Sequence, residues 1–576
     1  MTLPDIPFLI SRSHTSTEAN ITGFWRYVRP EIAQKTAPCS AACPVGEDIA
    51  RVEKLVHDGF YKRALECILM ENPFPAVSGR VCFHPCEGAC NRGQFDQAVS
   101  IRCIERFLGD EAFAGRLNPA VFRFPPKRKK AAVVGAGPAG LAMAYFSILL
   151  GYACTIFESE SEPGGLLRWG IPSYRLPGDV PAFEIKRIQG LGVDIRCNSP
   201  ITENALSELT HAYDAVFVAC GHRRPLTLGI VGEENMHDGL AFLSELKKGN
   251  IPDVKGSAAV IGGGNTAVDV SRTLVRLGIE TTLVYRRREQ DMPACSRETA
   301  SALEEGVRLL TLASPVRLEK TNDECTLYVQ RMKIDGKTAE GRARAVPKDA
   351  PVEAIHMGHV FSAVGAQAEE PWDRLMAMDD DHIRLSHCRI AVGKTPIIYG
   401  GDLADIDKSL AHAVASGKQA AVAMDVILSG NGVDVAEDMR KIQVGGGPSI
   451  SLEIYIGGER KNRRPRVVAY GDLNPDYFTL QPRVSAHSIP LTFLEPEKAF
   501  SELEQPLSED AVLRESGRCF NCGICNDCGN CRLFCPEMAV TGTGGNRAIL
   551  LEYCKGCGIC VAECPRCAMA LREEPE

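Results

Sequence analysis

Two segments of the chain show the same succession of hydrophobic and polar positions. Each has a short run of consecutive apolar residues, then a glycine-rich turn, then a longer stretch with helical spacing. These segments are residues 129–150, KKAAVVGAGPAGLAMAYFSILL, and residues 257–278, SAAVIGGGNTAVDVSRTLVRLG. A short, wholly apolar run predicts a strand buried in a parallel sheet, and the stretch after the turn predicts a helix. The pattern therefore predicts two strand–turn–helix units, each typical of a doubly wound α/β domain.

The first turn has the glycine spacing of a dinucleotide-binding site. The glycines of G-x-G-x-x-G are Gly135, Gly137 and Gly140, and the two residues between the second and the third are Pro138 and Ala139. Glycine here permits a tight turn, lets backbone amides approach a pyrophosphate and allows the helix to pack closely on the strand. The next predicted strand, YACTIFESE, leads to Glu158, which is placed to bind a ribose hydroxyl pair. We expect FAD at this turn.

The second turn differs from the first in the residues that follow it. Its fingerprint positions are Gly262, Gly264, Asn265, Thr266 and Ala267. The next predicted strand, TTLVYRRRE, ends in Arg286, Arg287 and Arg288 rather than in an acid. An acid would bind the ribose 2′-hydroxyl of NAD, whereas arginine favours the 2′-phosphate of NADP. We expect NADPH, with NADH as the alternative if these arginines are only a solvated surface.

The two fingerprints predict an NAD(P) domain inserted into an FAD domain. Residues 359–371, HVFSAVGAQAEEP, are expected to form a strand and a turn that return the chain to the FAD domain. Residues 395–421 then place Gly401 and Asp402 before a helix. In flavoproteins with two dinucleotide sites such an aspartate binds the ribityl chain, and the helix N-terminus points at the flavin. The alternative for Asp402 is a helix N-cap.

The chain contains 24 cysteines, 13 before residue 400 and 11 after residue 518. A chain of this length does not need a disulfide framework, so the two cysteine-rich ends predict metal sites. The amino-terminal group is Cys39, Cys43, Cys82, Cys86 and Cys90, whose short gaps are typical of iron–sulfur ligands. Zinc is the alternative, but it takes only four ligands.

The carboxy-terminal cysteines form a duplicated C-x-x-C-x-x-C-x-x-x-C-P motif. The first run is Cys525, Cys528, Cys531 and Cys535, and the second is Cys554, Cys557, Cys560 and Cys564. In two-cluster ferredoxins the fourth cysteine of each run binds the other cluster. The expected [4Fe–4S] sets are Cys525, Cys528, Cys531 and Cys564, and Cys554, Cys557, Cys560 and Cys535. Zinc knuckles are the alternative, Cys567 has no expected metal role, and Cys519 and Cys522 remain to be explained.

The middle of the chain resembles a known family. The segments GGLLRWGIPSYRLP (164–177), GGGNTAVD (262–269) and YGGDL (399–403) resemble the small subunit of NADPH-dependent glutamate synthase. The same module resembles the front half of dihydropyrimidine dehydrogenase and the flavin subunit of bifurcating transhydrogenases, over roughly residues 35–430. The resemblance implies FAD contacts from Gly165, Leu166 and Arg168. It also implies that flavin N5 accepts hydride from a stacked nicotinamide without a catalytic acid or base.

The resemblance further implies two [4Fe–4S] clusters in an amino-terminal helical domain. The ligands of the cluster nearer the flavin correspond to Cys43, Cys82, Cys86 and Glu105. The farther cluster corresponds to Cys39 and Cys90 plus an upstream R-C-x-x-C-G, which this sequence lacks. Residues 518–523, RCFNCG, supply that element at the other end of the chain. We hypothesise that Cys519 and Cys522 complete the farther site, within one chain or across a homodimer; the alternative is an inert pair or a local disulfide.

The expected organisation is α/β with a helical amino-terminal iron–sulfur domain and a carboxy-terminal bacterial-type 2[4Fe–4S] ferredoxin domain. The boundaries are residues 1–127 for the helical domain, 128–252 and 355–432 for the FAD domain, 253–354 for the NAD(P) domain, 433–517 for a linker region and 518–576 for the ferredoxin domain. Within the linker region, residues 501–520 are expected to form an acidic helix. Three clusters are expected, with the shared site as a fourth.

The net charge of the chain and the length of its apolar runs restrict which kinds of partner we expect. A net charge of −8 without a long basic run gives no indication of a nucleic-acid partner. The start of the chain lacks a signal-peptide pattern and no apolar run is long enough to span a bilayer, so we expect a cytoplasmic protein without a membrane span. No pattern for a further organic substrate site is evident, so a protein partner is expected to exchange electrons with NAD(P)H through FAD and the clusters.

The tail and the RCFNCGICNDC stretch resemble the DsrL-like NAD(P)H:acceptor oxidoreductases that accompany dissimilatory sulfite reductase. This resemblance implies a role in sulfur metabolism with a sulfite reductase-like or ferredoxin partner. The alternatives are a glutamate synthase-like electron donor, a flavin-based electron-bifurcating subunit and a non-catalytic electron-relay subunit.

Overall fold

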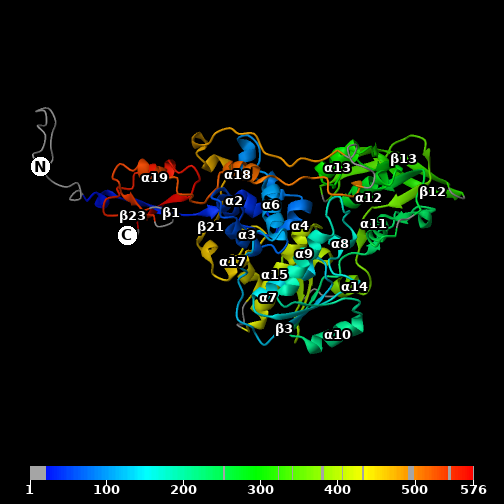
Figure 1. Ribbon diagram of the computed structural model, residues 1–576, viewed down its shortest axis with the longest axis horizontal. Helices are drawn as coiled ribbons and strands as arrows, with labels where there is room; N and C mark the ends of the chain where they lie inside the picture. Colours follow the sequence, from blue (N-terminus) through cyan, green and yellow to red (C-terminus); the bar gives the residue numbers. More distant parts are fainter. Residues whose placement is uncertain are drawn as a thin grey trace, which may run out of the picture.

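The computed structural model describes residues 21–574 except 251–252, 322–323, 340, 378–381, 405–406, 431–433, 491–497 and 543–546. In Figure 1 the cysteine-rich carboxy-terminal segment, in red, lies at one end of the molecule, beside the blue amino-terminal helices. The two large sheets lie beyond those helices, in cyan, green and yellow. In the part of the chain that the structure describes, no helix combines the length and hydropathy needed to cross a bilayer.

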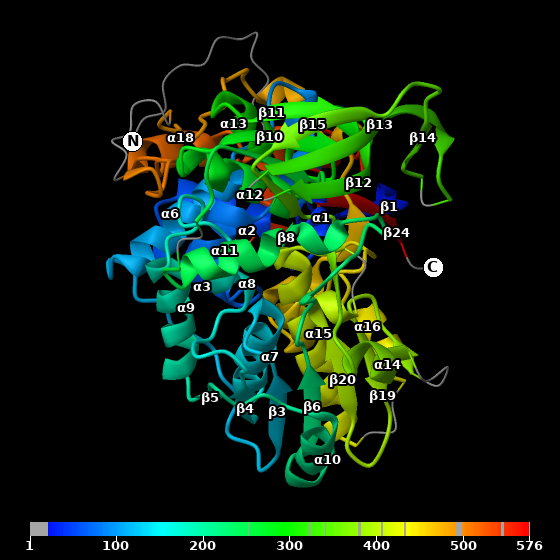
Figure 2. The ribbon, with the colours of Figure 1, turned by 90° about the vertical axis from the view of Figure 1, so that its right-hand side faces the viewer.

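The first glycine turn belongs to a seven-stranded sheet with the strand order β18-β19-β20-β6-β3-β4-β5, most of which Figure 2 shows side by side. Five of these strands run parallel: β20 (Ile397–Gly400), β6 (Ala215–Val218), β3 (Lys130–Val134), β4 (Ala153–Phe157) and β5 (Asp194–Arg196). The other two, β18 (Ile383–Arg384) and β19 (Cys388–Ala391), pair antiparallel at the β20 edge. The apolar helices α7 (Pro138–Leu149) and α15 (Leu410–Leu428) pack together, and their buried side chains form one core with those of the sheet.

The second glycine turn belongs to a separate parallel sheet with the order β11-β10-β9-β16-β8. Its strands are β8 (His237–Asp238), β9 (Ser257–Ile261), β10 (Glu280–Tyr285), β11 (Arg308–Thr311) and β16 (His359–Ser362). Both β8 and β16 lie outside the residues 253–354 expected for the NAD(P) domain, so this sheet uses residues on both sides of that range. An antiparallel sheet of β12 (Ala313–Thr321), β13 (Glu324–Lys337), β14 (Ala343–Pro347) and β15 (Glu353–Met357) packs against it.

Six short helices hold the amino-terminal cysteines. They are α1 (Pro38–Ala42), α2 (Ile49–His57), α3 (Tyr61–Leu69), α4 (Pro75–Val81), α5 (Pro85–Gly88) and α6 (Ile101–Phe113). Helix α18 (Glu509–Gly517) packs against α2 and α6 and leads into the carboxy-terminal segment. Of the acidic helix expected over residues 501–520, only residues 509–517 are helical. The N-cap is Ser508, whose hydroxyl accepts a hydrogen bond from the Ala511 amide at 3.3 Å.

The two ends of the described chain pair with each other. Strand β1 (Val28–Ile32) pairs antiparallel with β24 (Met569–Glu573). Just after β1, the Lys35 amide donates to the Gly523 carbonyl at 2.9 Å, and the Lys35 ammonium donates to the Met569 carbonyl at 2.9 Å. Strand β2 (Lys35–Thr36) also pairs with β21 (Arg464–Val467). Residues 28–36 therefore connect the helical domain to the carboxy-terminal segment within one chain.

A buried ion pair joins α15 to the helical domain. The Lys418 ammonium lies 2.6 Å from Glu71 Oε2, and both side chains are at most 1% exposed. Removing one partner of a buried pair costs about 3–5 kcal/mol when the other charge is left uncompensated. Arg460 Nη1 lies 3.6 Å from Glu71 Oε1 and limits that loss here. We therefore expect Lys418→Met to lower the apparent thermal unfolding midpoint clearly. Lys441→Met, which removes only the surface ion pairs of Lys441 with Glu437 and Asp438, should cost under about 1 kcal/mol. Equal midpoints for the two variants would contradict this assignment.

Candidate cofactor sites

The first glycine turn has no space for side chains at two of its three fingerprint positions. A Cβ at Gly140 would lie 1.9 Å from the Gly135 carbonyl oxygen, and one at Gly135 would lie 2.6 Å from the Ala219 carbonyl oxygen. Gly135 also has a φ of 98°, which favours glycine. Gly137 has open space on its Cβ side, directly before α7. The turn is thus tight where the helix meets the strand and open where a phosphate can approach the helix N-terminus.

Glu158 lies directly after β4 and is buried beside this turn. Its Oε2 accepts a hydrogen bond from the Ala136 amide at 2.7 Å, and its Oε1 accepts one from the Glu160 amide at 2.9 Å. The carboxylate is therefore held between the glycine turn and the end of the neighbouring strand. This is the position from which the acid of a dinucleotide site contacts a ribose.

A cavity of about 500 Å³ lies at the carboxyl ends of the parallel strands. Its lining includes most of the residues expected to bind FAD: Gly135, Gly137, Pro138, Ala139, Glu158, Gly165, Leu166, Gly401 and Asp402. Two expected residues do not line it: Gly140 is used in helix–strand packing, and Arg168 pairs with Glu162. The size and the open glycine turn fit a bound dinucleotide.

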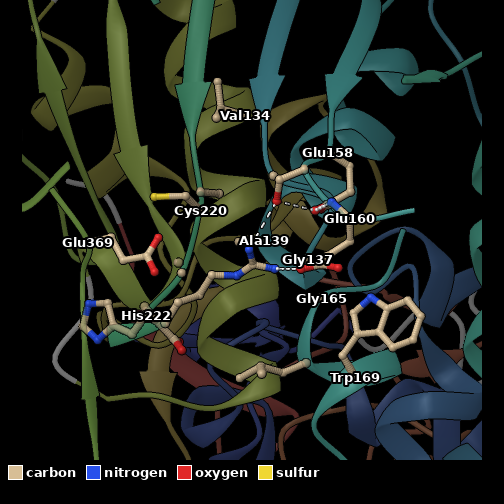
Figure 3. Close-up of a pocket in the computed structure, with 18 of the residues that line it drawn as sticks. Val134, Gly137, Ala139, Glu158, Glu160, Gly165, Trp169, Cys220, His222 and Glu369 are labelled. Atoms are coloured by element: carbon tan, nitrogen blue, oxygen red, sulfur yellow. Dashed lines mark hydrogen bonds and ion pairs between the residues drawn. The ribbon is translucent and has the colours of Figure 1, made fainter. Parts of the chain in front are cut away.

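The cavity wall also has residues that the motif analysis did not single out. Figure 3 shows Glu158 and Glu160 on one side, His222 and Glu369 on another, and Trp169 at the edge. His222 follows β6, and ligands of such sheets bind beyond the carboxyl ends of strands, so strand order could have indicated it. The indole N–H of Trp169 is buried and has no hydrogen-bond partner among the described residues. The start of α11 (Gly239–Lys247) contributes Leu240 and Ala241, which brings the second sheet's domain to the cavity.

The second glycine turn repeats the first in its geometry. Gly262 has a φ of 149°, and a Cβ there would lie 2.4 Å from the Ala363 carbonyl oxygen. Gly264 is open on its Cβ side and precedes α12 (Asn265–Arg276), which contains Thr266 and Ala267. The side chain of Asn265 accepts a hydrogen bond from the Cys295 amide at 2.9 Å. The turn again leaves a helix N-terminus open to a phosphate.

The three arginines after β10 have different surroundings. Arg288 pairs with Asp291 at 2.7 Å, and Arg287 donates from Nε to the Ala343 carbonyl at 2.6 Å. Arg286 is exposed and has no hydrogen bond or ion pair to another described residue. Arg286 is therefore the member of the run whose guanidinium is available for an anion.

The cysteines expected nearer the flavin lie at helix ends next to the FAD domain. Cys43 follows α1, Cys82 follows α4 and Cys86 lies in α5; Cys43 and Cys82 pack against the core of the seven-stranded sheet. Burial raises the pKa of the Cys86 thiol well above its usual range, and the nearby Cys43 and Cys82 raise it further. These three thiols are therefore close neighbours. Their set faces the domain that holds the large cavity.

Glu105, the fourth expected ligand, shares its surroundings with a second acid. Asn72 Nδ2 donates to Glu105 Oε1 at 3.0 Å and to Glu47 Oε1 at 2.8 Å. Burial is the largest cause of the raised pKa of Glu105, and the neighbouring Glu47 adds to it. Burial likewise raises the pKa of Glu47 to about 7. Sequence reasoning did not single out Glu47, although it lies only four residues after Cys43.

The structure brings Cys519 and Cys522 together with Cys39 and Cys90. Burial raises the pKa of Cys39 well above its usual range, and the next contributions come from Cys90, Cys519 and Cys522. Two N–H groups point at these sulfurs: Asn91 Nδ2 lies 3.5 Å from Cys522 Sγ, and the Asn521 amide lies 3.4 Å from Cys519 Sγ. Each of the four is a free thiol. Four free thiols, of which Cys39 and Cys522 are buried and Cys90 and Cys519 half-buried, fit a [4Fe–4S] cluster.

The carboxy-terminal cysteines gather in two small hollows. One is lined by Cys525, Cys528, Cys531 and Cys564, and the other by Cys535, Cys554, Cys557 and Cys560. Each hollow thus takes three cysteines from one run and the fourth from the other. Cys528 and Cys557 are exposed, whereas Cys531, Cys554 and Cys560 are buried. Cys567 lines neither hollow.

The described residues contain no group of three or more histidine, cysteine, aspartate or glutamate side chains arranged to hold a single metal ion. A [4Fe–4S] cluster differs from a single ion because each cysteine binds a different iron.

Comparison with known proteins assigns the central part of the chain. Residues 129–420 match the family model "Pyridine nucleotide-disulphide oxidoreductase". The chain belongs to this family. Residues 32–116 match the model "dihydropyrimidine dehydrogenase domain II, 4Fe-4S cluster". The expected α/β nucleotide-binding domains and amino-terminal 4Fe-4S domain are thereby confirmed, as is the expectation of an NAD(P)-dependent oxidoreductase at the level of the family.

Three curated relatives illustrate the range of this family. The NADP(+)-dependent formate dehydrogenase subunit beta of Moorella thermoacetica is 35% identical over 74% of this chain and 66% of its own length. The NADPH-Fe(3+) oxidoreductase subunit beta of Geobacter sulfurreducens is 36% identical over 62% of this chain and 56% of its own. The NAD-dependent dihydropyrimidine dehydrogenase subunit PreT of Escherichia coli O157:H7 is 31% identical over 68% of this chain and 92% of its own. The chain therefore spans less than two thirds of the first two relatives.

Among solved structures, Mycobacterium tuberculosis FprA in complex with NADPH matches 53% of this chain and 84% of its own at 17% identity, with a TM-score of 0.45.

Proposed function

We propose that this protein transfers electrons between NADPH and a partner protein through FAD and four [4Fe–4S] clusters. The observation that carries the proposal is the succession of four cysteine sets from the FAD domain to the carboxy-terminal end of the molecule. When bound, FAD accepts a hydride and passes its electrons on singly, which iron–sulfur clusters require. The role of the chain's residues is to hold these groups in order.

Contacts between neighbouring sets support this order. The set of Cys43, Cys82 and Cys86 adjoins the set of Cys39, Cys90, Cys519 and Cys522, because Cys39 lies close enough to Cys86 to raise its pKa. At the far end the two carboxy-terminal sets adjoin each other, because Cys531 contributes to the raised pKa of Cys560. The exposed Cys528 and Cys557 belong to the carboxy-terminal sets. A ferredoxin-like exit to a partner at that end is consistent with this exposure.

The proposed partner is a dissimilatory sulfite reductase or its electron carrier. The support is the resemblance of the tail to DsrL-like proteins together with relatives that are named as subunits. Affinity purification from native extract tests the partner, with sulfite reductase subunits as the expected co-purifying proteins. Recovery of a different redox enzyme would replace this partner but leave the electron-transfer role intact.

The activity itself is tested with the isolated protein. Anaerobically purified protein is expected to oxidise NADPH with an artificial dye as acceptor. Failure with both NADPH and NADH, in protein that contains FAD and iron, would favour a non-catalytic relay instead.

The preference for NADPH is proposed to depend on Arg286. A charge-assisted hydrogen bond to a phosphate contributes about 1.5–3 kcal/mol, so Arg286→Ala is expected to raise the KM for NADPH roughly 10- to 100-fold. The KM for NADH, which lacks the 2′-phosphate, should not change. Arg288→Ala is the matched control, because Arg288 is paired with Asp291. Equal effects of Arg286→Ala on the two nucleotides would contradict this role.

A further inference from the structure

Arg566 is a half-buried cation without a counter-ion among the described residues. Its Nε is buried and has no hydrogen-bond partner, and no described carboxylate pairs with its guanidinium. The guanidinium carbon lies 5.2 Å from the centroid of the Phe478 ring. Arginine keeps its charge at all ordinary pH values. Removing part of a guanidinium from solvent without a counter-ion is costly, so a negative group held beside Arg566 would stabilise it.

The groups nearest to Arg566 belong to two different cysteine sets. Burial lowers its pKa, and the opposing contributions come from Cys528 and Cys564 of one set and from Cys519 and Cys522 of the other. Arg566 also lines the hollow formed by the first of these sets. It therefore lies between two sets of cysteines. One is the set of Cys39, Cys90, Cys519 and Cys522, called the shared set below; the other, the nearer carboxy-terminal set, is Cys525, Cys528, Cys531 and Cys564.

The backbone fixes Arg566 in this position. Its carbonyl accepts a hydrogen bond from the Gly523 amide at 2.7 Å, directly after Cys522. A Cβ at Gly523 would lie 2.6 Å from the Lys35 carbonyl oxygen, so this segment is tightly packed. The loop that contains Arg566 is thus joined to the segment that contains Cys519 and Cys522.

We propose that Arg566 is a counter-charge for two clusters, the one held by the shared set and the one held by the nearer carboxy-terminal set. Its positive charge raises the reduction potential of both clusters. This inference rests on the proposed function. Four thiolates around a [4Fe–4S] core give a net negative charge, and each one-electron reduction adds another. A fixed cation between two such groups stabilises the reduced form of each. Arg566 is a positioning residue that acts through charge.

Arg547 provides a matched comparison within the same segment. Its Nη1 lies 2.7 Å from Cys531 Sγ, and its guanidinium also pairs with Asp527. Arg547 thus contacts one set only, and its charge is already compensated. Arg532 is exposed and serves as a control for charge removal at the surface.

The test is an anaerobic redox titration of the full-length holoprotein, followed by the paramagnetic signals of the reduced clusters. Arg566→Gln is expected to lower the midpoint potentials of two clusters together, and Arg566→Lys to keep both near the wild-type values. Arg547→Gln should shift one potential at most, and Arg532→Gln none. Unchanged potentials in Arg566→Gln, or a shift in one cluster alone, would overturn the proposal.

A titratable variant covers the case in which Arg566→Gln loses iron. In Arg566→His the charge depends on pH, so the same two potentials should fall as the pH rises through the imidazole pKa. If the midpoint potentials of these two clusters depend on pH in Arg566→His as they do in the wild-type protein, Arg566 is not a counter-charge for both clusters. Wild-type iron content separates this inference from the proposed function: clearly fewer than about 16 irons per chain would contradict the four clusters, whereas full iron with unshifted potentials contradicts only the role of Arg566.

Discussion

Replacing Cys519 and Cys522 together with serine is expected to remove about four irons per chain. Cys519 and Cys522 lie with Cys39 and Cys90 in one hydrophobic cluster, so the four thiols of this site come from both ends of the sequence. Serine hydroxyls are much weaker ligands of a cubane than thiolates, so a site with two of its four ligands changed should not be loaded. Iron and acid-labile sulfide per chain measure the loss directly.

The same variant should separate the two ends of the electron pathway. We expect the flavin content to remain at the wild-type level, because the FAD cavity uses none of these residues. Reduction of the carboxy-terminal clusters by NADPH should slow strongly, since the intervening cluster is absent. Cys567→Ser is the control, because Cys567 is close by but lines neither carboxy-terminal hollow. Full iron content in the double variant would show that Cys519 and Cys522 are not ligands.

Gly140→Ala is expected to abolish FAD binding. A Cβ at this position would lie 1.9 Å from the Gly135 carbonyl oxygen, so the helix and the glycine turn must separate. The displaced atoms belong to the backbone, which cannot move aside as the end of a flexible side chain can. The pyrophosphate site at the start of α7 would therefore be distorted. The absorbance of bound flavin in purified protein measures the effect.

Gly190→Ala is the matched control for this substitution. Gly190 lies at the end of α9 (Asp179–Gly190), and a Cβ there meets no atom within 4 Å. Alanine in a helix is favoured over glycine by roughly 0.5–1 kcal/mol, so this variant should keep its flavin and its stability. Retention of stoichiometric FAD by Gly140→Ala would contradict the role assigned to this turn.

Local sequence patterns predicted those parts of the fold whose conformation is set by residues close together in the chain. The contacts of Gly140 with Gly135 and of Ala267 with Gly262 join residues close in sequence, so glycine spacing indicated both turns. The approach of the distant Ala219 and Ala363 carbonyls to these glycines could not be predicted in that way. The start of α18 could also have been predicted, because Ser508 is a good N-cap and Glu509 and Asp510 follow it in the first turn. A strand at the start of residues 359–371 was expected, but it was assigned to the FAD domain, whereas β16 pairs with β9 in the second sheet. Strand β8 was beyond such reasoning, since it has only two residues and its partner lies far along the chain.

The two cysteines in excess of the ferredoxin motif suggested the shared set. Nothing in the sequence indicated which residues surround the cysteine sets. Neither Glu47 beside Asn72 nor Arg566 between two sets belongs to a motif, and each acquires its position only through packing. Contacts between residues far apart in the sequence, such as the pairing of β1 with β24, leave no local periodicity. Residues that act at such junctions can be found only in three dimensions.

The meeting of the two ends also has a consequence for biogenesis. A ribosome that has completed Cys39 and Cys90 must add more than four hundred further residues before Cys519 appears. At 5–20 residues per second this takes roughly 20–90 s. During that time a nascent chain holds half of a metal-binding site with vulnerable thiols, and the site can be filled only after translation is nearly finished. The order of cofactor loading is therefore expected to follow synthesis, with this cluster inserted late and oxygen exposure most damaging before it.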